Sequence, residues 1–250
     1  MSFSATESRP LAGALYLVAG ATSASGTAAA RALDDAGATV LAAGTDAGRL
    51  EGRVPFAAGR YVADLADPDA VAGLARRIHE EHGRLDGLVH LVGGWRGGRG
   101  LAGQSDEDWE FLLTHVVTTL RNTSRAFYED LADSARGRLV IVSASAVEHP
   151  TASGANYVAA KAAAEAWVRA VAAGFRAAQS GRRQDPVPQR SAAVVLAIKA
   201  FTDAAARAAE PEKSFAGFTD VEDFGRELVR VASGDADGLN GARIDLTAAR

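Results

Sequence analysis

Short apolar runs alternate with segments of helical character along most of the chain. The first run, Leu15-Tyr-Leu-Val-Ala19, has the length of a strand, and Thr27-Ala-Ala-Ala-Arg-Ala-Leu33 follows it as good helix-forming sequence. Residues 39–43 are almost continuously apolar, with Thr39 first, which is typical of a strand buried on both faces of a parallel sheet. The pattern therefore predicts strands separated by helices.

Capping residues mark where several of these helices begin. Asp67 precedes Pro68 at the start of one helix, while Ser105 and Asp220 open two others. The predicted strands are residues 14–19, 39–43, 60–63, 88–92, 138–142, 192–198 and 241–246, and the predicted helices are residues 26–36, 47–53, 68–82, 109–132, 155–178 and 221–233. This alternation predicts an α/β fold, a doubly wound parallel sheet (Rossmann fold) with helices on both faces.

The segments outside these elements complete the predicted organisation. We expect residues 1–12 to form a flexible N-terminal arm and residues 13–250 to form one domain. The polar, basic segment 180–190 is predicted to be an exposed loop, and residues 201–218 a mobile cover. Three loops are expected to shape a substrate pocket: 94–104, 146–155 and 199–219.

Composition excludes several classes of function. The net charge of −4 gives no general affinity for nucleic acid or anionic membranes. Without cysteine, the chain has no disulfides and no thiolate metal site, and its five histidines show no metal-binding spacing, so we expect no metal. The N-terminus does not resemble a signal peptide and no apolar run reaches membrane-spanning length, so we expect a cytoplasmic protein.

The turn between the first strand and the first helix is a candidate phosphate site. Gly20 permits a sharp turn, and Gly26 permits close packing of the helix on the strand. Backbone N–H groups and the positive end of the helix dipole meet at such a turn. The sequence therefore favours nucleotide binding here over an ordinary turn of small residues.

A second motif lies on the predicted helix 155–178. Tyr157 and Lys161 are four residues apart and therefore share one helix face. A neighbouring ammonium stabilises a phenolate, so we expect Lys161 to lower the pKa of Tyr157. The tyrosine is then suited to exchange a proton with a carbonyl or hydroxyl oxygen.

These motifs resemble those of the short-chain dehydrogenase/reductase family. The family's Thr-Gly-x-x-x-Gly-x-Gly corresponds to Ala19 to Gly26, with Ala24 in place of the middle glycine. The resemblance implies an NAD(P)-dependent oxidoreductase that transfers hydride between a nicotinamide and a carbonyl or secondary alcohol. It implies catalytic roles for Tyr157, Lys161 and Ser145, and cofactor contacts from Gly20, Thr22, Ser23, Ser25, Gly26, Thr45, Asp64, Leu65, Gly93, Tyr157 and Lys161.

Four further family positions or motifs differ in this chain. The substrate-binding serine falls at Ala144, flanked by Ser143 and Ser145, and we favour Ser145 because it is farther along the chain. The family's asparagine falls at Val116, where His115 or Thr119 are candidate substitutes. The Pro-Gly after the sixth strand is replaced by Ala197-Ile198, with Thr202 matching the threonine that follows, and His90 begins the segment where the family has Asn-Asn-Ala-Gly.

The cofactor and partners are less well defined. The family's ribose-reading residue falls at Gly44 or Thr45, with Asp46 next, and the lack of a visible phosphate-neutralising residue favours NAD weakly over NADP. The resemblance implies a homodimer or homotetramer formed through helices 109–132 and 155–178. Arg96 and Arg99 indicate either an anionic substrate or a mobile surface loop. A dinucleotide-binding protein with weak or no catalysis, in a regulatory or scaffold role, remains the alternative function.

Overall fold

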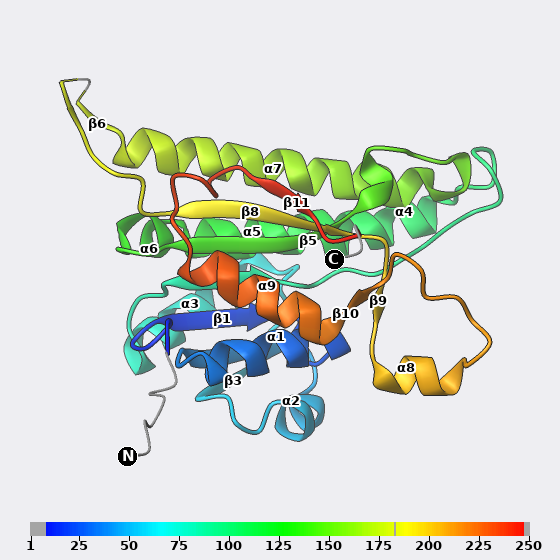
Figure 1. The fold of residues 1–250 in the computed structure, drawn as a ribbon, viewed down its shortest axis with the longest axis horizontal. Coiled ribbons are helices and arrows are strands. Elements are labelled where there is room, and N and C mark those ends of the chain that lie inside the picture. Colours follow the sequence, from blue (N-terminus) through cyan, green and yellow to red (C-terminus); the bar gives the residue numbers. More distant parts are fainter. Residues whose placement is uncertain (1–8, 183, 248–250) are drawn as a thin grey trace, which may run out of the picture.

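The computed structural model describes residues 9–182 and 184–247, and seven parallel strands form its main sheet (Figure 1). The strands are β1 (Leu15–Ala19), β2 (Thr39–Gly44), β3 (Gly59–Val62), β4 (Gly87–His90), β5 (Arg138–Ala144), β8 (Ala192–Ile198) and β11 (Arg243–Asp245). Their order is β11-β8-β5-β4-β1-β2-β3. Because the order reverses between β1 and β4, the carboxyl ends of these two strands border the crevice in which such folds bind ligands.

Helices cover both faces of the sheet, as predicted. They are α1 (Ala24–Asp35), α2 (Ala47–Arg53), α3 (Pro68–Glu81), α4 (Asp106–Leu112), α5 (Thr119–Ala126), α6 (Tyr128–Asp133), α7 (Ala155–Gln179), α8 (Ala204–Ala209) and α9 (Val221–Ser233). Alternate residues of β1 enter two cores: Leu17 packs with α3, α5 and α7, whereas Val18 packs with α1 and α9. The fold is therefore the predicted doubly wound α/β sheet, with α7 lying along one side of it (Figure 1).

The predicted helix starts are confirmed. An Asp67 carboxylate oxygen accepts the N–H of Asp69 at 2.8 Å, and the Ser105 hydroxyl accepts the N–H of Asp108 at 3.1 Å. Asp220 caps α9 in the same way. Each contact satisfies a first-turn N–H group that has no partner within its own helix, and each is local enough in sequence to be predicted.

The predicted helix 109–132 is interrupted, so that prediction was wrong in its continuity. A π-helical segment, Leu113–Thr118, separates α4 from α5, and Phe127 separates α5 from α6. The hydroxyls of Thr119 and Thr123 donate to the carbonyls of His115 and Thr119, both at 2.8 Å, and such bonds compete with the regular backbone ladder.

Other boundaries also differ from prediction. The segment 180–190 contains a hairpin of β6 (Gly181–Arg182) and β7 (Asp185–Pro186), and the predicted cover 201–218 contains α8 and β9 (Phe201–Thr202), which pairs with β10 (Thr219–Asp220). Residues 1–8 of the predicted arm lie outside the described residues. Leu11, predicted in that arm, is buried and donates its N–H to Ala36. No helix in the described residues has the length and apolar character needed to span a membrane.

Candidate active site

A cavity of about 310 Å³ lies where the carboxyl ends of the central strands meet the first turns of α1 and α7. Its lining residues come from both predicted motifs and from the segments between them: Ser23, Ser25, Leu91, Val92, Gly93, Gly94, Trp95, Val142, Tyr157, Lys161, Ile198, Lys199, Ala200 and Phe201. The fold thus brings the phosphate turn and the Tyr157–Lys161 pair, far apart in sequence, to one continuous space.

The phosphate turn requires both of its glycines. Gly20 has a φ of +82°, and a Cβ there would lie 3.0 Å from the carbonyl carbon of Leu91. A Cβ at Gly26 would collide with the carbonyl oxygen of Gly20. A side chain at either position would therefore push the turn out of shape, as expected for a cradle that brings backbone N–H groups close to a ligand.

The alanine that replaces the middle family glycine does not line the cavity. Ala24 is exposed, begins α1 and faces a groove shared with α9. Its neighbours Ser23 and Ser25 line the cavity instead, and the Ser23 hydroxyl accepts the N–H of Gly26 at 3.0 Å. The extra methyl group therefore leaves the N-terminus of α1 open toward the cavity.

Lys161 is a buried cation. Its Nζ donates to the Val142 carbonyl at 2.9 Å and lies 5.8 Å from the centre of the Tyr157 ring. Burial lowers the pKa of Lys161 to about 8, and the opposing influence of the Glu165 carboxylate is smaller. The site therefore holds an ammonium group that is only weakly favoured over its neutral form.

The expectation that Lys161 lowers the pKa of Tyr157 was wrong for this state of the protein. Burial raises the pKa of Tyr157, because the phenolate would lose its hydration in a half-buried position. The Lys161 ammonium points to the Val142 carbonyl, and the Tyr157 hydroxyl has no hydrogen bond within the described part of the chain.

The two serines that flank Ala144 face different surroundings. Ser143 is buried and its hydroxyl donates to the Glu165 carboxylate at 2.6 Å, on the side away from the cavity lining. Ser145 is half-buried and starts a short 3₁₀ turn, Ser145–Val147, directly after β5. Ser145 does not itself line the cavity, so the structure brings it next to the site rather than into its wall.

An ion-pair network that the sequence reasoning missed holds this turn. The Arg243 guanidinium lies 3.3 Å from the Glu165 carboxylate and 3.0 Å from Glu148, and it donates to the Ala144 carbonyl at 3.1 Å. It thereby ties β11 and α7 to the end of β5. The available signal was Glu165, four residues after Lys161 on the same face of α7.

The candidate substitutes for the family asparagine are already engaged. Val116 occupies the expected place, because a Cβ at Gly93 would lie 3.8 Å from both its side chain and the Lys161 Nζ. His115 pairs through Nδ1 with the Phe111 carbonyl at 2.8 Å, and Thr119 bonds to the His115 carbonyl. Neither side chain is thus directed to Lys161.

His90 is an interior histidine. Its two ring nitrogens lie 3.1 Å from the hydroxyls of Thr119 and Thr123, which joins β4 to α5. Burial, and to a lesser degree the charge of Lys161, lowers the pKa of His90 to about 3. The ring is therefore neutral at physiological pH and acts as packing between sheet and helix.

The remaining predicted cofactor residues lie away from the cavity lining. Thr45 and Asp64 are exposed, and the Asp64 carboxylate accepts the N–H of Ala66. Leu65 is buried, and its carbonyl accepts from Asn122. The hydroxyl of Thr202 is buried without a partner in the described residues, which leaves one polar group near Phe201 unsatisfied.

The glycine-rich loop after β4 is anchored rather than free. The Arg96 guanidinium lies 3.7 Å from the centre of the Phe111 ring and 3.5 Å from the Asp108 carboxylate. The N–H of Gly98 donates to the Ser153 carbonyl at 2.8 Å. Arg96 therefore helps to hold the loop on α4.

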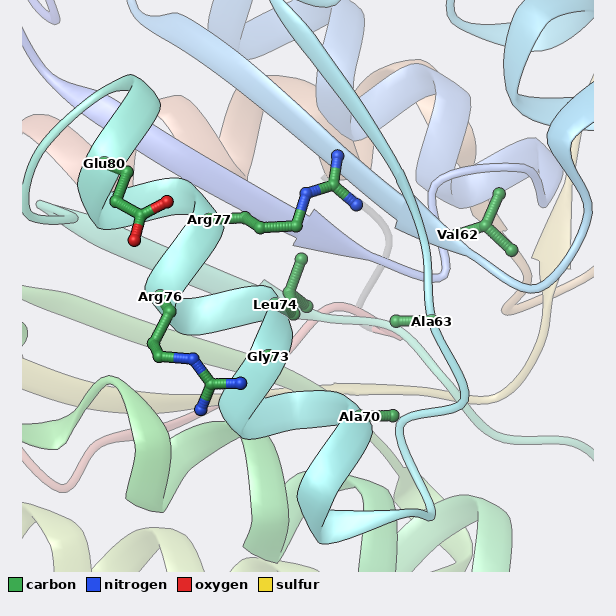
Figure 2. Close-up of a pocket in the computed structure, with 8 residues that line it drawn as sticks. All are labelled: Val62, Ala63, Ala70, Gly73, Leu74, Arg76, Arg77 and Glu80. Atoms are coloured by element: carbon green, nitrogen blue, oxygen red, sulfur yellow. The ribbon is translucent and has the colours of Figure 1, made fainter.

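A second hollow lies at the edge of the sheet between β3 and α3 (Figure 2). It has a volume of about 360 Å³ and is lined by Val62, Ala63, Ala70, Gly73, Leu74, Arg76, Arg77 and Glu80. Arg77 pairs with Glu81 at 3.8 Å and lies over the Tyr61 ring. None of the predicted site residues lines this hollow. Among the described residues, no group of three or more histidine and acidic side chains is placed to bind a metal.

Sequence comparison finds relatives for most of the chain. A model of the short chain dehydrogenase family matches residues 14–179. The 2,3-dihydro-2,3-dihydroxybenzoate dehydrogenase of Bacillus subtilis is 34% identical over 158 residues, which is 61% of this chain. The match spans 60% of the length of that curated relative.

Solved structures share the fold over nearly the full length. A short chain dehydrogenase from Shigella flexneri superposes with a TM-score of 0.82 at 22% identity, covering 98% of this chain and 94% of that one. A second, from Shigella flexneri 2a and complexed with NADP, has a TM-score of 0.81 at 21% identity and covers 96% and 99%. With the family match over well more than half of its length, the chain belongs to the short chain dehydrogenase family.

Proposed function

We propose that the protein is an NAD(P)-dependent oxidoreductase that transfers hydride between the nicotinamide and a carbonyl or secondary alcohol. The observation that carries this proposal is the single cavity that joins the first turn of α1 to Tyr157 and Lys161. The glycine cradle at Gly20 and Gly26 and the open N-terminus of α1 fit a pyrophosphate. A bound nicotinamide nucleotide supplies or accepts the hydride.

The residues of the chain handle the proton. The Tyr157 hydroxyl donates a proton to the substrate oxygen during carbonyl reduction and takes one back during alcohol oxidation. We propose that Lys161 acts during the reaction, when the phenolate forms: its ammonium lies on the same helix face, 5.8 Å from the centre of the Tyr157 ring, and an ammonium stabilises a nearby phenolate. A positioned acid of this kind contributes typically about 10²–10⁴-fold in rate.

Ser145 is proposed to orient the substrate oxygen. It is the first residue after β5, and the Arg243 network anchors the strand end just before it. Ser143 is unsuited to this role because its hydroxyl is committed to Glu165 inside the protein. Ser145 is half-buried in the short turn that directly follows β5.

For the finer choice of cofactor we propose NADP rather than the NAD that the sequence weakly favours. Arg49, on α2, places a guanidinium nitrogen 3.4 Å from the Thr22 carbonyl, next to the phosphate turn. The alternative ribose ligand, Asp46, uses a carboxylate oxygen to accept the Arg49 N–H at 2.8 Å. An arginine beside the ribose site favours a 2′-phosphate, and a relative of the same fold is solved with NADP.

The cofactor choice is tested by titrating NADPH and NADH into the wild type and Arg49→Ala. We expect tighter binding of NADPH by the wild type and a loss of about tenfold in NADPH affinity in the variant, as for a partly exposed charge pair with phosphate. Equal affinity for both nucleotides in both proteins would contradict the choice of NADP, and tighter binding of NADH would restore NAD.

The catalytic proposal is tested by following NADPH oxidation with a panel of ketones. Turnover by the wild type that falls at least 100-fold in Tyr157→Phe, while NADPH still binds, supports the assignment. Tyr128→Phe is the matched control, because Tyr128 stacks on Phe175 outside the cavity. Undiminished turnover by Tyr157→Phe would remove the proposed role.

The non-catalytic alternative has specific support in Ala144 and Val116, which occupy two family positions without a polar side chain. Tight nucleotide binding without turnover of any carbonyl would favour a regulatory or scaffold protein. Absence of nucleotide binding would contradict both functions.

A further inference from the structure

The loop after β4 holds one large aromatic side chain at the cavity. Trp95 lines the space that Tyr157 and Lys161 also line, yet 68% of its surface is exposed. It is one of a few large apolar side chains that are exposed in the described part of the chain. Because exposure of an indole to water is unfavourable, an exposed indole at a cavity is a candidate binding surface.

The indole is backed by the loop on one side. A Cβ at Gly97 would lie 2.5 Å from the Trp95 six-membered ring and 3.4 Å from the Ser153 carbonyl oxygen. The ring therefore lies against the Gly97 backbone, near the segment that precedes Tyr157. Only glycine at position 97 leaves the indole where it is, so the contact sets the side chain in place.

Contacts hold the loop residues before and after Trp95 in place, although the loop is rich in glycine. On one side Gly94 fits closely against the Phe111 ring, and Arg96 covers that ring and pairs with Asp108. On the other side Gly98 bonds to Ser153. Further along the loop, the Gln104 amide donates to the Ala152 and Ser153 carbonyls and accepts the Asn156 N–H. The exposed indole is thus presented on an anchored loop rather than on a free one.

The rest of the cavity wall is mainly apolar. Leu91, Val92, Ile198 and Phe201 contribute to it, and the cations Lys161 and Lys199 also line it. Lys161 donates to the Val142 carbonyl, while Lys199 donates to the Ala216 carbonyl at 3.0 Å. The wall therefore offers apolar surface and the aromatic rings of Trp95, Tyr157 and Phe201, and none of its lining residues carries a carboxylate.

From this geometry we infer that the carbonyl or alcohol carbon of the substrate is attached to an aromatic ring, and that this ring stacks on Trp95. Offset stacking on an indole adds attraction beyond simple burial of area and favours flat rings over puckered ones. The inference rests on the proposed function of the cavity, because it places the reacting oxygen at Tyr157 and the ring at Trp95.

The test compares aryl methyl ketones with their cyclohexyl counterparts, which keep the carbon skeleton but lose the flat ring. We expect the wild type, with NADPH, to have a kcat/KM about tenfold higher for each aryl ketone. In Trp95→Ala this preference should fall to near one, mainly through a higher KM for the aryl ketones. Trp95→Phe, which keeps a flat ring, should keep most of the preference.

Trp109→Phe is the matched control, since Trp109 packs against the core from α4 and does not line the cavity. It should leave the aryl preference at the wild-type value. Equal kcat/KM values for the two ketone series in the wild type, or an aryl preference that survives Trp95→Ala, would overturn the inference.

Saturation-transfer NMR separates this inference from the proposed function. With NADP bound, aryl ring protons of the ketone should receive saturation from the wild type and much less from Trp95→Ala. If no ketone is reduced but this difference is present, the aromatic site stands and the catalytic proposal fails. If ketones are reduced and no difference is seen, the aromatic site is wrong while the catalytic proposal stands.

Discussion

Helix α7 carries polar groups of opposite character at its two ends. At its C-terminus, which lies by the amino ends of β5 and β8, Gln179 is buried and fully bonded within the protein. At its N-terminus, Tyr157 and Lys161 face a cavity with few protein partners. One end satisfies its polar groups internally, and the other leaves them available.

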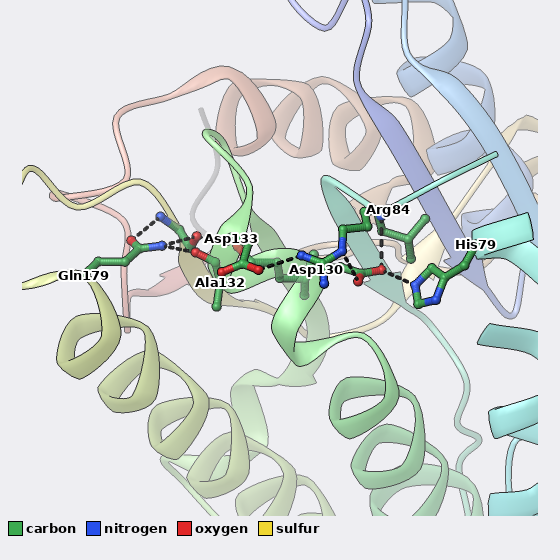
Figure 3. A network of polar contacts seen from close by, with 9 residues as sticks. His79, Arg84, Asp130, Ala132, Asp133 and Gln179 are labelled. Carbon is green, nitrogen blue, oxygen red and sulfur yellow. Dashed lines mark hydrogen bonds and ion pairs between the residues drawn. The ribbon is translucent and has the colours of Figure 1, made fainter. Parts of the chain in front are cut away.

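The hydrogen bonds at the C-terminal end of α7 centre on Gln179 (Figure 3). Its amide nitrogen donates to the Ala132 carbonyl at 2.6 Å and to the Ser191 hydroxyl at 2.7 Å. Its amide oxygen accepts the N–H groups of Arg190 and Ser191 at 2.8 and 3.0 Å. The side chain therefore locks α6, α7 and the entry to β8 together.

The same edge contains a bonded carboxylate. Asp130 is buried and lies 2.7 Å from a ring nitrogen of His79, and it also accepts the N–H of Leu85 at 3.2 Å (Figure 3). Arg84 lies 3.7 Å from it and bonds to Asp133. Polar groups at this edge thus connect α3 and α6 to the start of β4.

At the N-terminal end of α7, by contrast, polar groups have few hydrogen-bond partners. The Tyr157 hydroxyl and the buried Thr202 hydroxyl have no hydrogen bond within the described residues, and Lys161 has one carbonyl partner. Polar groups with few partners at a cavity are candidates for contact with a ligand. The comparison indicates that the polar groups around Gln179 and Asp130 serve stability, whereas those at the N-terminal end of α7 serve function.

The largest expected effect comes from Lys161→Met. Turnover should fall at least 100-fold, because the phenolate of Tyr157 loses its stabilising cation. The free energy of unfolding at pH 7 should nevertheless rise by roughly 1–3 kcal/mol, because a buried charge with a pKa lowered to about 8 is removed. Steady-state kinetics and urea unfolding measure the two effects, and a destabilised variant would contradict the comparison.

Gln179→Ala is the matched change at the other end of the helix. It leaves the N–H groups of Arg190 and Ser191 buried without an acceptor, and it should lower the free energy of unfolding by roughly 2–4 kcal/mol. NADPH affinity measured below the unfolding temperature should stay at the wild-type value. A variant of normal stability but weak NADPH affinity would break the proposed division between the two ends.

Ser143 and Ser145, which flank Ala144 at the end of β5, distinguish a structural role from a role at the cavity. Ser145→Ala should lower kcat/KM by about 10–100-fold with little change in stability, as for loss of one hydrogen bond made to the reacting oxygen. Ser143→Ala should cost about 1–2 kcal/mol of stability, since the Glu165 carboxylate loses a 2.6 Å bond, with little change in kcat/KM. The reverse outcome would assign the substrate role to Ser143.

A further effect is expected in the pH dependence of stability. Below pH 8 Lys161 is protonated in both states, so the cost of burying its charge is fully present. Between pH 8 and about 10.5 only the unfolded state keeps the proton, so stability rises with pH by at most about 1.4 kcal/mol per unit. Unfolding of the wild type relative to Lys161→Met over this range should show that rise, and a flat difference would contradict the lowered pKa.

Local sequence signals accounted for the fold and for the two motifs. Asp67, Ser105 and Asp220 cap helices through residues two or three positions away, so their roles can be read from sequence. Tyr157 and Lys161 reach the cavity because a regular helix fixes their spacing.

Long-range contacts account for what the sequence could not provide. The interruption of helix 109–132 includes bonds from Thr119 and Thr123 to His90 on another element. The Glu165–Arg243 pair joins residues 78 positions apart. Glu165 also accepts a hydrogen bond from the Ser143 hydroxyl. The face of β5 on which Ser143 lies depends on the register of the whole sheet.

The central claim is that a dinucleotide completes the polar groups left open at the N-terminal end of α7 and at the turn after β1. Thermal unfolding of the wild type with increasing NADPH tests it most directly. At about 100 times Kd the account predicts a gain of about 2.7 kcal/mol, which for a chain of this size raises the midpoint by roughly 5–10 °C. An unchanged midpoint up to millimolar NADPH and NADH would contradict the account.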